Sequence, residues 1–215
     1  EEIFVNKRRL PESQQYLEQE VRNVLTALRT IRKEVALNDS FSLTAEWILS
    51  THARLLEGLE TPDYVSPGEY RTVSVGVGTY RGAPAEDVAY LMEKMCDWIN
   101  SIRADAKASE SEDRAFFLTF FAATLAHLYL AWIHPFGDGN GRTARLIECA
   151  ILAHSGLVPW ISTNVLSDFY NKTRSRYYDR LEAASRQEDV AGFVAYSAIG
   201  FRDQLRDQVR TVQHE

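Results

Sequence analysis

Twelve consecutive residues, His134-Pro-Phe-Gly-Asp-Gly-Asn-Gly-Arg-Thr-Ala-Arg145, combine the side chains that are needed to handle a polyphosphate. The imidazole of His134 has a pKa near neutrality, so it can take a proton from an attacking hydroxyl. Arg142 and Arg145 are three residues apart, so on a helix they share one face and can bind phosphate oxygens. The segment predicts a catalytic base beside an anion-binding site.

The carboxylate of Asp138 does not attract a phosphate by itself, because both groups are negative. It becomes useful when Mg²⁺ lies between them, held by one carboxylate and by substrate phosphates. Gly137, Gly139 and Gly141 permit backbone angles that are closed to other residues. A helix that starts near Asn140 would then present free N–H groups and its positive dipole end to the turn. We expect a backbone cradle for phosphate, with Asp138 as the Mg²⁺ ligand.

Apolar segments flank this turn on both sides. Residues 115–133 carry no charged side chain, and residues 143–153 are mostly apolar, so both are predicted to be buried helices. The residue before a proline avoids the α region, so the first helix should end at His134, just before Pro135. The pattern predicts a helix-loop-helix unit with the polar turn at its centre.

The turn resembles the Fic motif, HPF-x-[DE]-GN-G-R-x-x-R, and every fixed position of that motif is present. Residues 52–58 are similar to an early helix of Fic domains, and residues 68–72 and 75–78 are similar to their flap. The similarity covers residues 43–201. It implies the Fic fold, an all-α, mainly helical bundle around a central helix-loop-helix with a small β-hairpin flap. It also implies a protein adenylyltransferase, which transfers AMP from ATP to a protein hydroxyl while pyrophosphate leaves on Mg²⁺.

The resemblance assigns roles by position. His134 would be the general base that deprotonates a Ser, Thr or Tyr of the target, or of the chain itself, and Asp138 would hold Mg²⁺. Phe136 would fill the core and fix the turn. The phosphates of the nucleotide would be bound by Gly139, Asn140, Gly141, Arg142 and Arg145.

The flap, from Tyr70 to Tyr80, is rich in Val, Thr and Tyr with glycines near its end, which predicts a short hairpin. By resemblance, the target protein docks here by adding a strand to the hairpin. Further nucleotide contacts are expected from Val77, Gly78, Thr79, Tyr80, Tyr177 and Tyr178. Core packing is the alternative for the two tyrosines at 177 and 178.

The residues of the turn also allow other interpretations. Arg145 could instead form a surface ion pair with Glu148, three residues later. A calcium loop is excluded because Arg142 and Cys149 stand where oxygen ligands belong. A Walker-type loop is excluded because no Gly-Lys-Ser/Thr follows. The remaining histidines show no metal-ligand spacing: His52, His127, His154 and His214.

The 215 residues fit one helical domain, with 45% hydrophobic residues for its core. We divide the chain into an N-terminal helical region (1–42), the Fic core (43–201) and the end of a C-terminal helix (202–215). Only the flap is predicted to be strand. Helices are predicted at residues 13–37, 44–59, 85–102, 115–133, 142–154, 164–185 and 190–212.

A net charge of -6 gives no basic footprint for nucleic acid, so no nucleic-acid partner is expected. Residues 115–133 approach membrane-spanning length. Thr119, Thr124 and His127 interrupt the apolar run, so we expect a buried core helix and no membrane. Cys96 and Cys149 lie inside predicted helices, and no secretion signal is evident. The protein is expected to be cytoplasmic, with a secreted effector as the alternative.

The motif does not determine how the site is regulated or which group is transferred. Many Fic proteins carry an inhibitory helix with [ST]-x-x-x-E-[GN], whose glutamate pairs with the second motif arginine, and no full copy is present. Arg145 is therefore expected to be uncovered, with the inhibitory helix upstream or on an antitoxin-like partner. Alternatives to AMP transfer are UMP or phosphocholine transfer, AMP removal, and a non-catalytic module that binds nucleotide or a partner. Gly141 replaces the lysine of kinase relatives and argues against that branch.

Overall fold

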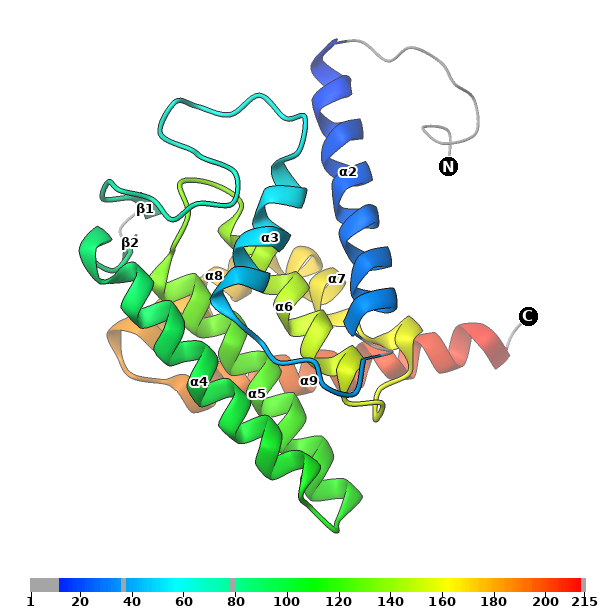
Figure 1. Ribbon diagram of the computed structural model, residues 1–215. Coiled ribbons are helices and arrows are strands. Elements are labelled where there is room, and N and C mark those ends of the chain that lie inside the picture. The colour runs from blue at the N-terminus through cyan, green and yellow to red at the C-terminus, as the bar shows by residue number, and fades with distance from the viewer. Residues whose placement is uncertain (1–11, 36–37, 78–79, 214–215) are drawn as a thin grey trace.

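The computed structural model describes residues 12–35, 38–77 and 80–213, and this part of the chain is mainly helical (Figure 1). Its centre is α5 (Glu112–Ile133), which packs between α4 (Val88–Lys107) and α6 (Asn140–His154). A 3₁₀ turn, η2 (Ala85–Asp87), leads into α4. The predicted mainly helical fold around a central helix-loop-helix is confirmed.

Helix α5 begins three residues before its apolar run, because its first turn is polar and capped. The Ser111 side chain accepts a hydrogen bond from the Arg114 N–H, and Glu112 and Asp113 lie at the positive end of the helix dipole. By length and composition α5 is also the one helix in the described residues that could cross a membrane. Most of its side chains from Thr119 onward are buried against neighbouring helices, as predicted for a core helix.

A second layer forms on α6. It consists of α2 (Glu12–Thr30), the π-helical turn η1 (Ile31–Val35) and α3 (Ala45–Leu56). Thr44 caps the start of α3, and its hydroxyl accepts from the Trp47 N–H at 3.1 Å. A separate small apolar cluster joins this layer to α6 and is made of Ala27, Ile31, Val35, Leu55, Leu146, Ala150 and Ala153. Burial of this cluster places α2 across the motif-bearing helix.

Helices α7 (Val165–Lys172), α8 (Arg174–Arg186) and α9 (Val190–Gln213) close the other side of α5, after a 3₁₀ turn, η3 (Trp160–Ser162). The sequence predicted one helix over residues 164–185, and this was wrong. The chain breaks at Thr173, with φ -111° and ψ 35°. Its hydroxyl lies 2.7 Å from the Phe169 carbonyl and 2.5 Å from the Tyr196 hydroxyl, and such side-chain bonds compete with the helix.

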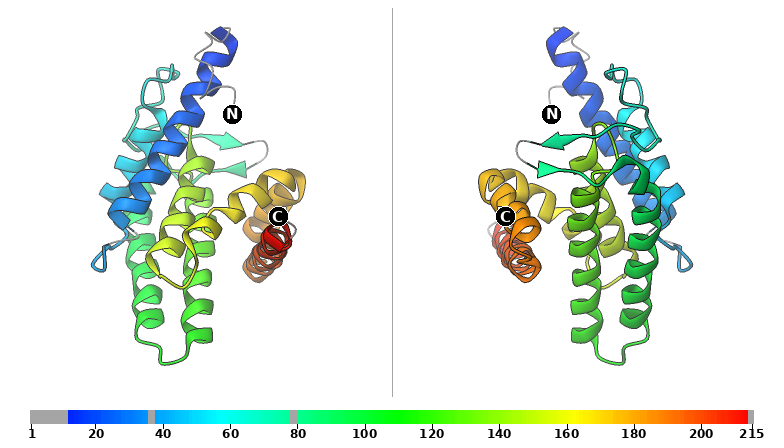
Figure 2. Two further views of the ribbon diagram at one scale, coloured as in Figure 1. Left: turned by 90° about the vertical axis from the view of Figure 1, so that its right-hand side faces the viewer. Right: turned by 90° about the vertical axis from the view of Figure 1, so that its left-hand side faces the viewer.

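The flap contains a hairpin of β1 (Gly76–Val77) and β2 (Tyr80–Arg81), with Gly76 opposite Arg81 and Val77 opposite Tyr80. A Cβ at Gly76 would come within 2.8 Å of the Tyr80 carbonyl oxygen, so the close pairing needs glycine there. The hairpin extends to the same side of the bundle as α8 and α9 (Figure 2). It is shorter than the predicted span of residues 70–80, because the chain from Tyr70 to Val75 follows an irregular path.

Candidate active site

Helix α5 ends at His134, which adopts the left-handed conformation with φ 52° and ψ 58°. The expected departure from the helix before Pro135 is confirmed. The ring Nδ1 lies 3.3 Å from the Ala131 carbonyl oxygen, which can only accept a hydrogen bond, so Nδ1 carries the proton. Nε2 is therefore the basic nitrogen, as a general base requires.

The pKa of His134 is lowered from its ordinary value of 6.5, and burial is the main cause. The hydrogen bond to Ala131 acts in the opposite direction, the charge of Arg71 lowers the pKa further, and the charge of Asp138 raises it. The net lowering keeps the imidazole neutral at neutral pH. A neutral ring is the form that accepts a proton.

The turn after His134 is closed by Asn140, which is only 4% exposed. Its Oδ1 accepts from the Phe136 N–H at 3.0 Å, and its Nδ2 donates to the Phe136 carbonyl at 2.8 Å. The side-chain amide thus pairs with one backbone unit across the turn. The predicted phosphate contact of Asn140 consequently depends on its backbone N–H, and it stays a prediction.

Phe136 is fully buried, and its ring stacks on His52 of α3 with centroids 3.7 Å apart and planes within 5°. His52 Nδ1 accepts from the Gly68 N–H at 3.0 Å, so its Nε2 donates to the Asp138 carbonyl, also at 3.0 Å. Burial lowers the pKa of His52 to about 4, which keeps this arrangement neutral. The core role predicted for Phe136 is confirmed, and His52 supports the turn from α3.

Helix α6 begins at Asn140 after Gly139, whose φ of 80° is accessible mainly to glycine. The Thr143 N–H bonds to the Gly139 carbonyl, so the amides of residues 140–142 belong to the unpaired first turn. Of the three glycines predicted to need unusual backbone angles, Gly139 alone has a positive φ. Gly137 is required because a Cβ would lie 2.9 Å from Val65, and Gly141 is an ordinary helical residue.

Arg142 is held between two carboxylates. Its Nη2 lies 2.8 Å from Asp138 Oδ2, and its Nη1 lies 2.6 Å from Glu20 Oε1 on α2. The second contact could not be predicted from the sequence pattern, since 122 residues separate the partners. Glu20 of α2 therefore forms an ion pair with Arg142, one of the two arginines that are predicted to bind phosphate.

Arg145 is partly exposed and has no hydrogen bond or ion pair to any residue that the structure describes. The alternative pairing with Glu148 is not formed, because the Glu148 carboxylate bonds to His127 at 3.1 Å and to Tyr170 at 3.0 Å. Tyr177 is 5% exposed, and its hydroxyl lies 2.8 Å from His127 Nε2. This burial favours the packing interpretation of Tyr177, and its adenine contact stays a prediction.

The other predicted nucleotide ligands are less constrained. Tyr178 is 45% exposed and stays a candidate for an adenine contact. The Tyr80 hydroxyl donates to the Trp132 carbonyl, so its side chain faces the end of α5. Gly78 and Thr79 lie outside the described residues. Val77 is placed in β1, at the tip of the flap.

A family model described as the Fic/DOC family matches residues 42–152. The chain belongs to the Fic/DOC family. Its two motif helices and the turn between them lie almost entirely inside the matched range.

Curated relatives and solved structures agree with this assignment. The chain is 32% identical over 179 residues to Protein adenylyltransferase fic-1 of Caenorhabditis briggsae, covering 83% of this chain and 31% of that protein. It is 34% identical over 163 residues to Protein adenylyltransferase Fic of Drosophila willistoni, covering 76% and 28%. The chain therefore spans less than a third of these relatives.

Two solved structures match the whole chain at 27% identity. Fic-1 (aa134 - 508) from C. elegans aligns with a TM-score of 0.73 over 58% of its length. A Fic family protein from Desulfovibrio desulfuricans G20 aligns with a TM-score of 0.72 over 59% of its length. These likenesses confirm the predicted Fic fold.

The Fic motif offers one carboxylate to a metal ion. No cluster of three His, Cys, Asp or Glu side chains in the described ranges could hold a metal by itself. The Asp138 side chain is 48% exposed and lies beside the unpaired amides of α6. This donor set fits a Mg²⁺ ion that takes its other ligands from substrate phosphates and water.

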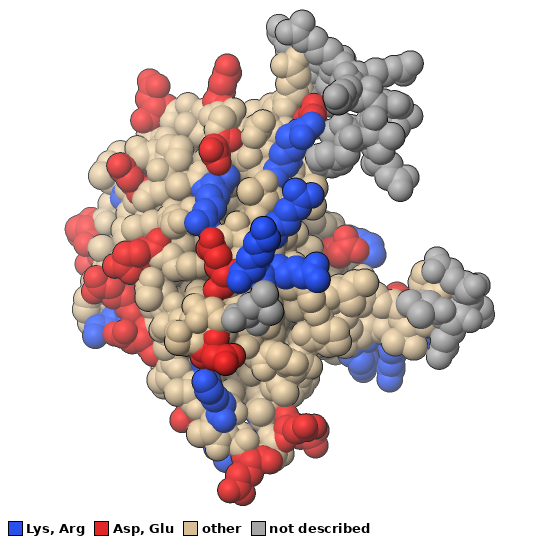
Figure 3. Space-filling model, turned by 45° about the vertical axis from the view of Figure 1, so that its right-hand side comes forward, with Lys and Arg blue, Asp and Glu red and all other residues tan. Residues whose placement is uncertain are grey.

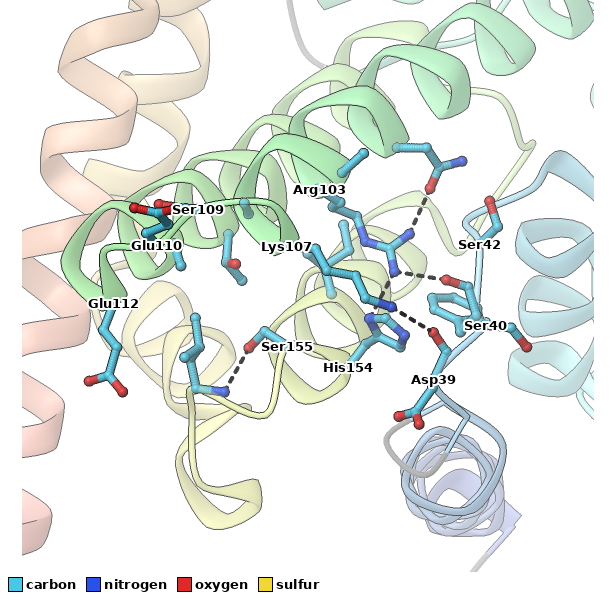
Figure 4. A pocket seen from close by; sticks show the side chains of 18 residues that line it. Asp39, Ser40, Ser42, Arg103, Lys107, Ser109, Glu110, Glu112, His154 and Ser155 are labelled. Atoms are coloured by element: carbon cyan, nitrogen blue, oxygen red, sulfur yellow. Dashed lines mark hydrogen bonds between the residues drawn. The ribbon is translucent and has the colours of Figure 1, made fainter.

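A cavity of about 530 Å³ lies elsewhere, between the end of α4, the start of α5 and the end of α6 (Figure 4). The lining reaches Thr119 on α5, and Thr119 precedes His134 by about four turns of helix, so roughly 20 Å along the axis separates the cavity from His134. The Arg103 guanidinium in this cavity bonds to Asn100, to the Phe41 carbonyl and to His154. The polar side chains of this cavity thus bond to backbone carbonyls of the segment before α3 and hold that segment against the bundle.

Basic side chains gather in the middle and upper part of the face shown in Figure 3, with a few acidic side chains beside them. Acidic side chains lie mostly toward the left edge and the lower tip of the same face. The net charge of -6 is therefore unevenly distributed over the surface. Such a local excess of positive charge attracts anions even on an acidic protein.

Proposed function

We propose that this Fic domain transfers AMP from ATP to a Ser, Thr or Tyr hydroxyl of a target protein. The observation that supports this most is the placement of a neutral His134, with Nε2 as its basic nitrogen, one turn before the unpaired amides of α6. Relatives with about one third sequence identity carry the name protein adenylyltransferase. The same arrangement of base and anion site could also support other phosphate transfers, but no observation favours any of them over AMP transfer.

In the proposed step, the target oxygen forms a bond to the α-phosphorus of ATP. The bond between that phosphorus and the bridging oxygen to the β-phosphate breaks, and pyrophosphate leaves. The proton of the hydroxyl moves to Nε2 of His134. The amides at the start of α6 and the guanidinium of Arg145 would stabilise the phosphate charge. Mg²⁺, held by Asp138 and substrate, would neutralise part of that charge.

The target is proposed to pair by its main chain with the flap hairpin. In the part of the chain that the structure describes, the sheet has two strands, so each has an outer edge on which a further strand can pair. Flap residues bind the last backbone carbonyls of α5. A peptide paired with the flap would therefore be held in a fixed position relative to His134. Pairing of this kind orients a hydroxyl while selecting few side chains.

The reaction type can be tested with ATP labelled on one phosphate at a time. The protein, Mg²⁺ and a candidate target are incubated with α- or γ-labelled ATP, and label on protein is measured after denaturing electrophoresis. Incorporation from the α-position only, with an intact-mass gain equal to one AMP, supports the proposal. Incorporation from the γ-position, or none from either position while ATP binds, would refute it.

The lowered pKa of His134 predicts the pH dependence of the transfer rate. A base is active above its pKa, so the rate should stay level through neutral pH and fall on acidification only below the ordinary histidine value of 6.5. The single-turnover rate at saturating MgATP, measured between about pH 5 and 8, tests this. A rate that already falls between pH 8 and 7 would contradict it.

We also propose that α2 restrains the site through Glu20, in place of the separate inhibitory element that the sequence suggested. Glu20 and Arg142 are 29% and 15% exposed, and their 2.6 Å contact competes with any phosphate for the same guanidinium. Glu20→Gln should raise the apparent affinity for MgATP by about five-fold, as expected from an ion pair worth about 1 kcal/mol. Calorimetric titration measures the change.

Glu18 supplies a matched control on the same helix. It pairs with Arg22 one turn away rather than with the motif, so Glu18→Gln changes the charge of α2 by the same amount. Glu18→Gln should leave MgATP affinity near that of the wild type. Equal effects of the two variants would show that general charge, rather than the contact with Arg142, controls binding.

A further inference from the structure

Arg71 lies beneath the flap and is 4% exposed, and within the described residues its guanidinium donates hydrogen bonds to backbone carbonyls alone. Its Nε bonds to the His134 carbonyl at 2.7 Å, and its Nη2 bonds to the Ile133 carbonyl at 3.3 Å and to the Ala83 carbonyl. Its Nη1 bonds to the Val73 carbonyl at 2.8 Å. One guanidinium thus joins both arms of the flap to the last residues of α5.

These contacts complete the end of α5, where carbonyls have no partner within the helix. The Leu130 and Ala131 carbonyls are bound by the N–H and the ring of His134 itself. The Trp132 carbonyl accepts from Tyr80, and the Ile133 carbonyl accepts from the Ala83 N–H at 3.2 Å. Past the helix end, the Arg71 N–H bonds to the Pro135 carbonyl at 2.9 Å. Flap residues therefore satisfy the carbonyls of residues 132–135.

The chemistry of this position selects arginine. None of its acceptors in the described part of the chain is a carboxylate, so the charge of Arg71 is matched by the negative end of the α5 dipole. A planar guanidinium has five N–H donors in a rigid fork, so it can bond more carbonyls in fixed directions than the three donors of an ammonium can. A Cβ at Gly82 would lie 2.9 Å from both Arg71 Nη2 and the His134 Cβ, so the packing leaves no room there for a side chain.

We propose that Arg71 is a positioning residue for His134, holding it in its left-handed conformation and coupling the flap, where the target is proposed to dock, to the base. The inference rests on the proposed AMP transfer. Arg71 is not expected to touch the nucleotide, because its donors are used by the backbone. Its loss should therefore slow the transfer step and leave the anion site on α6 intact.

Two variants test this in the full chain. Arg71→Met keeps the length of the side chain and removes its donors, and it should slow single-turnover transfer about 100-fold, the scale of a misplacement near 1 Å. Arg71→Lys keeps the charge and some of the bonds, so it should recover about ten-fold of that loss. The dissociation constant for MgATP should change less than about three-fold in both variants.

Arg103→Met is the matched control, because Arg103 is a half-buried arginine that likewise donates to a backbone carbonyl, and it lies in the cavity away from the motif. At a temperature where circular dichroism shows all variants folded, this control should keep the wild-type rate. An equal loss of rate in the Arg103 and Arg71 variants would overturn the proposal. So would an Arg71→Met protein with the wild-type rate, or one whose rate and MgATP affinity fall in proportion.

A second readout does not require AMP transfer. NMR spectra of protein labelled with ¹⁵N-histidine report which ring nitrogen is protonated, and the His134 signal is assigned by its absence in His134→Ala. Wild-type protein should show the Nδ1–H form at His134, and Arg71→Met should show a mixture of both forms. An unchanged Nδ1–H form would overturn the positioning role. If the wild type transfers no AMP, the proposed function fails, and this comparison still decides the role of Arg71.

Discussion

His134→Ala is expected to slow AMP transfer by about 10²- to 10⁴-fold, because the substitution removes the base that accepts the hydroxyl proton. Affinity for MgATP should stay within a few-fold of the wild type. The anion site is formed by the amides at the start of α6 and by arginines, and none of these is bonded to the His134 ring. Single-turnover incorporation of α-labelled ATP and calorimetric binding measure the two quantities separately.

His154→Ala is the control for this substitution. His154 is also partly buried, at the opposite end of α6, where it contacts the Asn38 carbonyl at 3.1 Å and Arg103 at 3.0 Å. Its replacement should leave transfer near the wild-type rate. If His134→Ala instead weakened nucleotide binding while transfer at saturation stayed unchanged, the histidine would be a binding residue and the proposed mechanism would be wrong.

The chemistry of the turn could be predicted from sequence because its parts are adjacent in the chain. The departure from the helix at His134, the start of α6 at Asn140 and the burial of Phe136 follow from local rules about proline, glycine and apolar residues. The left-handed conformation of His134 was not predicted, because the residue before a proline is usually extended. The role of the Asn140 side chain was less accessible. Nothing in the sequence indicates that its amide is used to close the turn on Phe136.

Contacts that join distant segments could not be predicted. Glu20 lies in an unremarkable run of polar helix, and only the packing of α2 on the small cluster with α6 brings it to Arg142. The sequence around Arg71 predicts a hairpin and does not indicate that the Arg71 side chain binds the carbonyls at the end of α5. In both cases a charged residue gains its partner from tertiary structure, and periodicity carries no information about that.

Element boundaries show the same limit at a smaller scale. The apolar run correctly located α5, while its capped polar first turn extended the helix to Glu112. The break at Thr173 escaped prediction because its cause is a hydroxyl bonded to Tyr196, 23 residues away. The sequence also resembles a continuous amphipathic helix there. Fold class was therefore more predictable than the exact ends of helices.

Phe136→Ala is expected to lower the free energy of unfolding by about 3 to 5 kcal/mol, the usual cost of truncating a fully buried phenylalanine. The ring is 0% exposed and stacked on His52, so its removal leaves a cavity between α3 and the turn. Urea denaturation followed by circular dichroism measures the change, provided that the slope with denaturant stays constant.

Phe117→Ala separates this packing effect from a general loss of aromatic surface. Phe117 is 59% exposed on α5, and within the described residues its ring stacks on Phe121 alone, so its truncation should cost no more than about 0.5 to 1 kcal/mol. Comparable losses for both variants would mean that Phe136 is not the anchor of the turn. Because His52 also bonds to the Asp138 carbonyl, the Phe136 cavity should reach the proposed metal ligand, and folded Phe136→Ala should bind MgATP more weakly than Phe117→Ala.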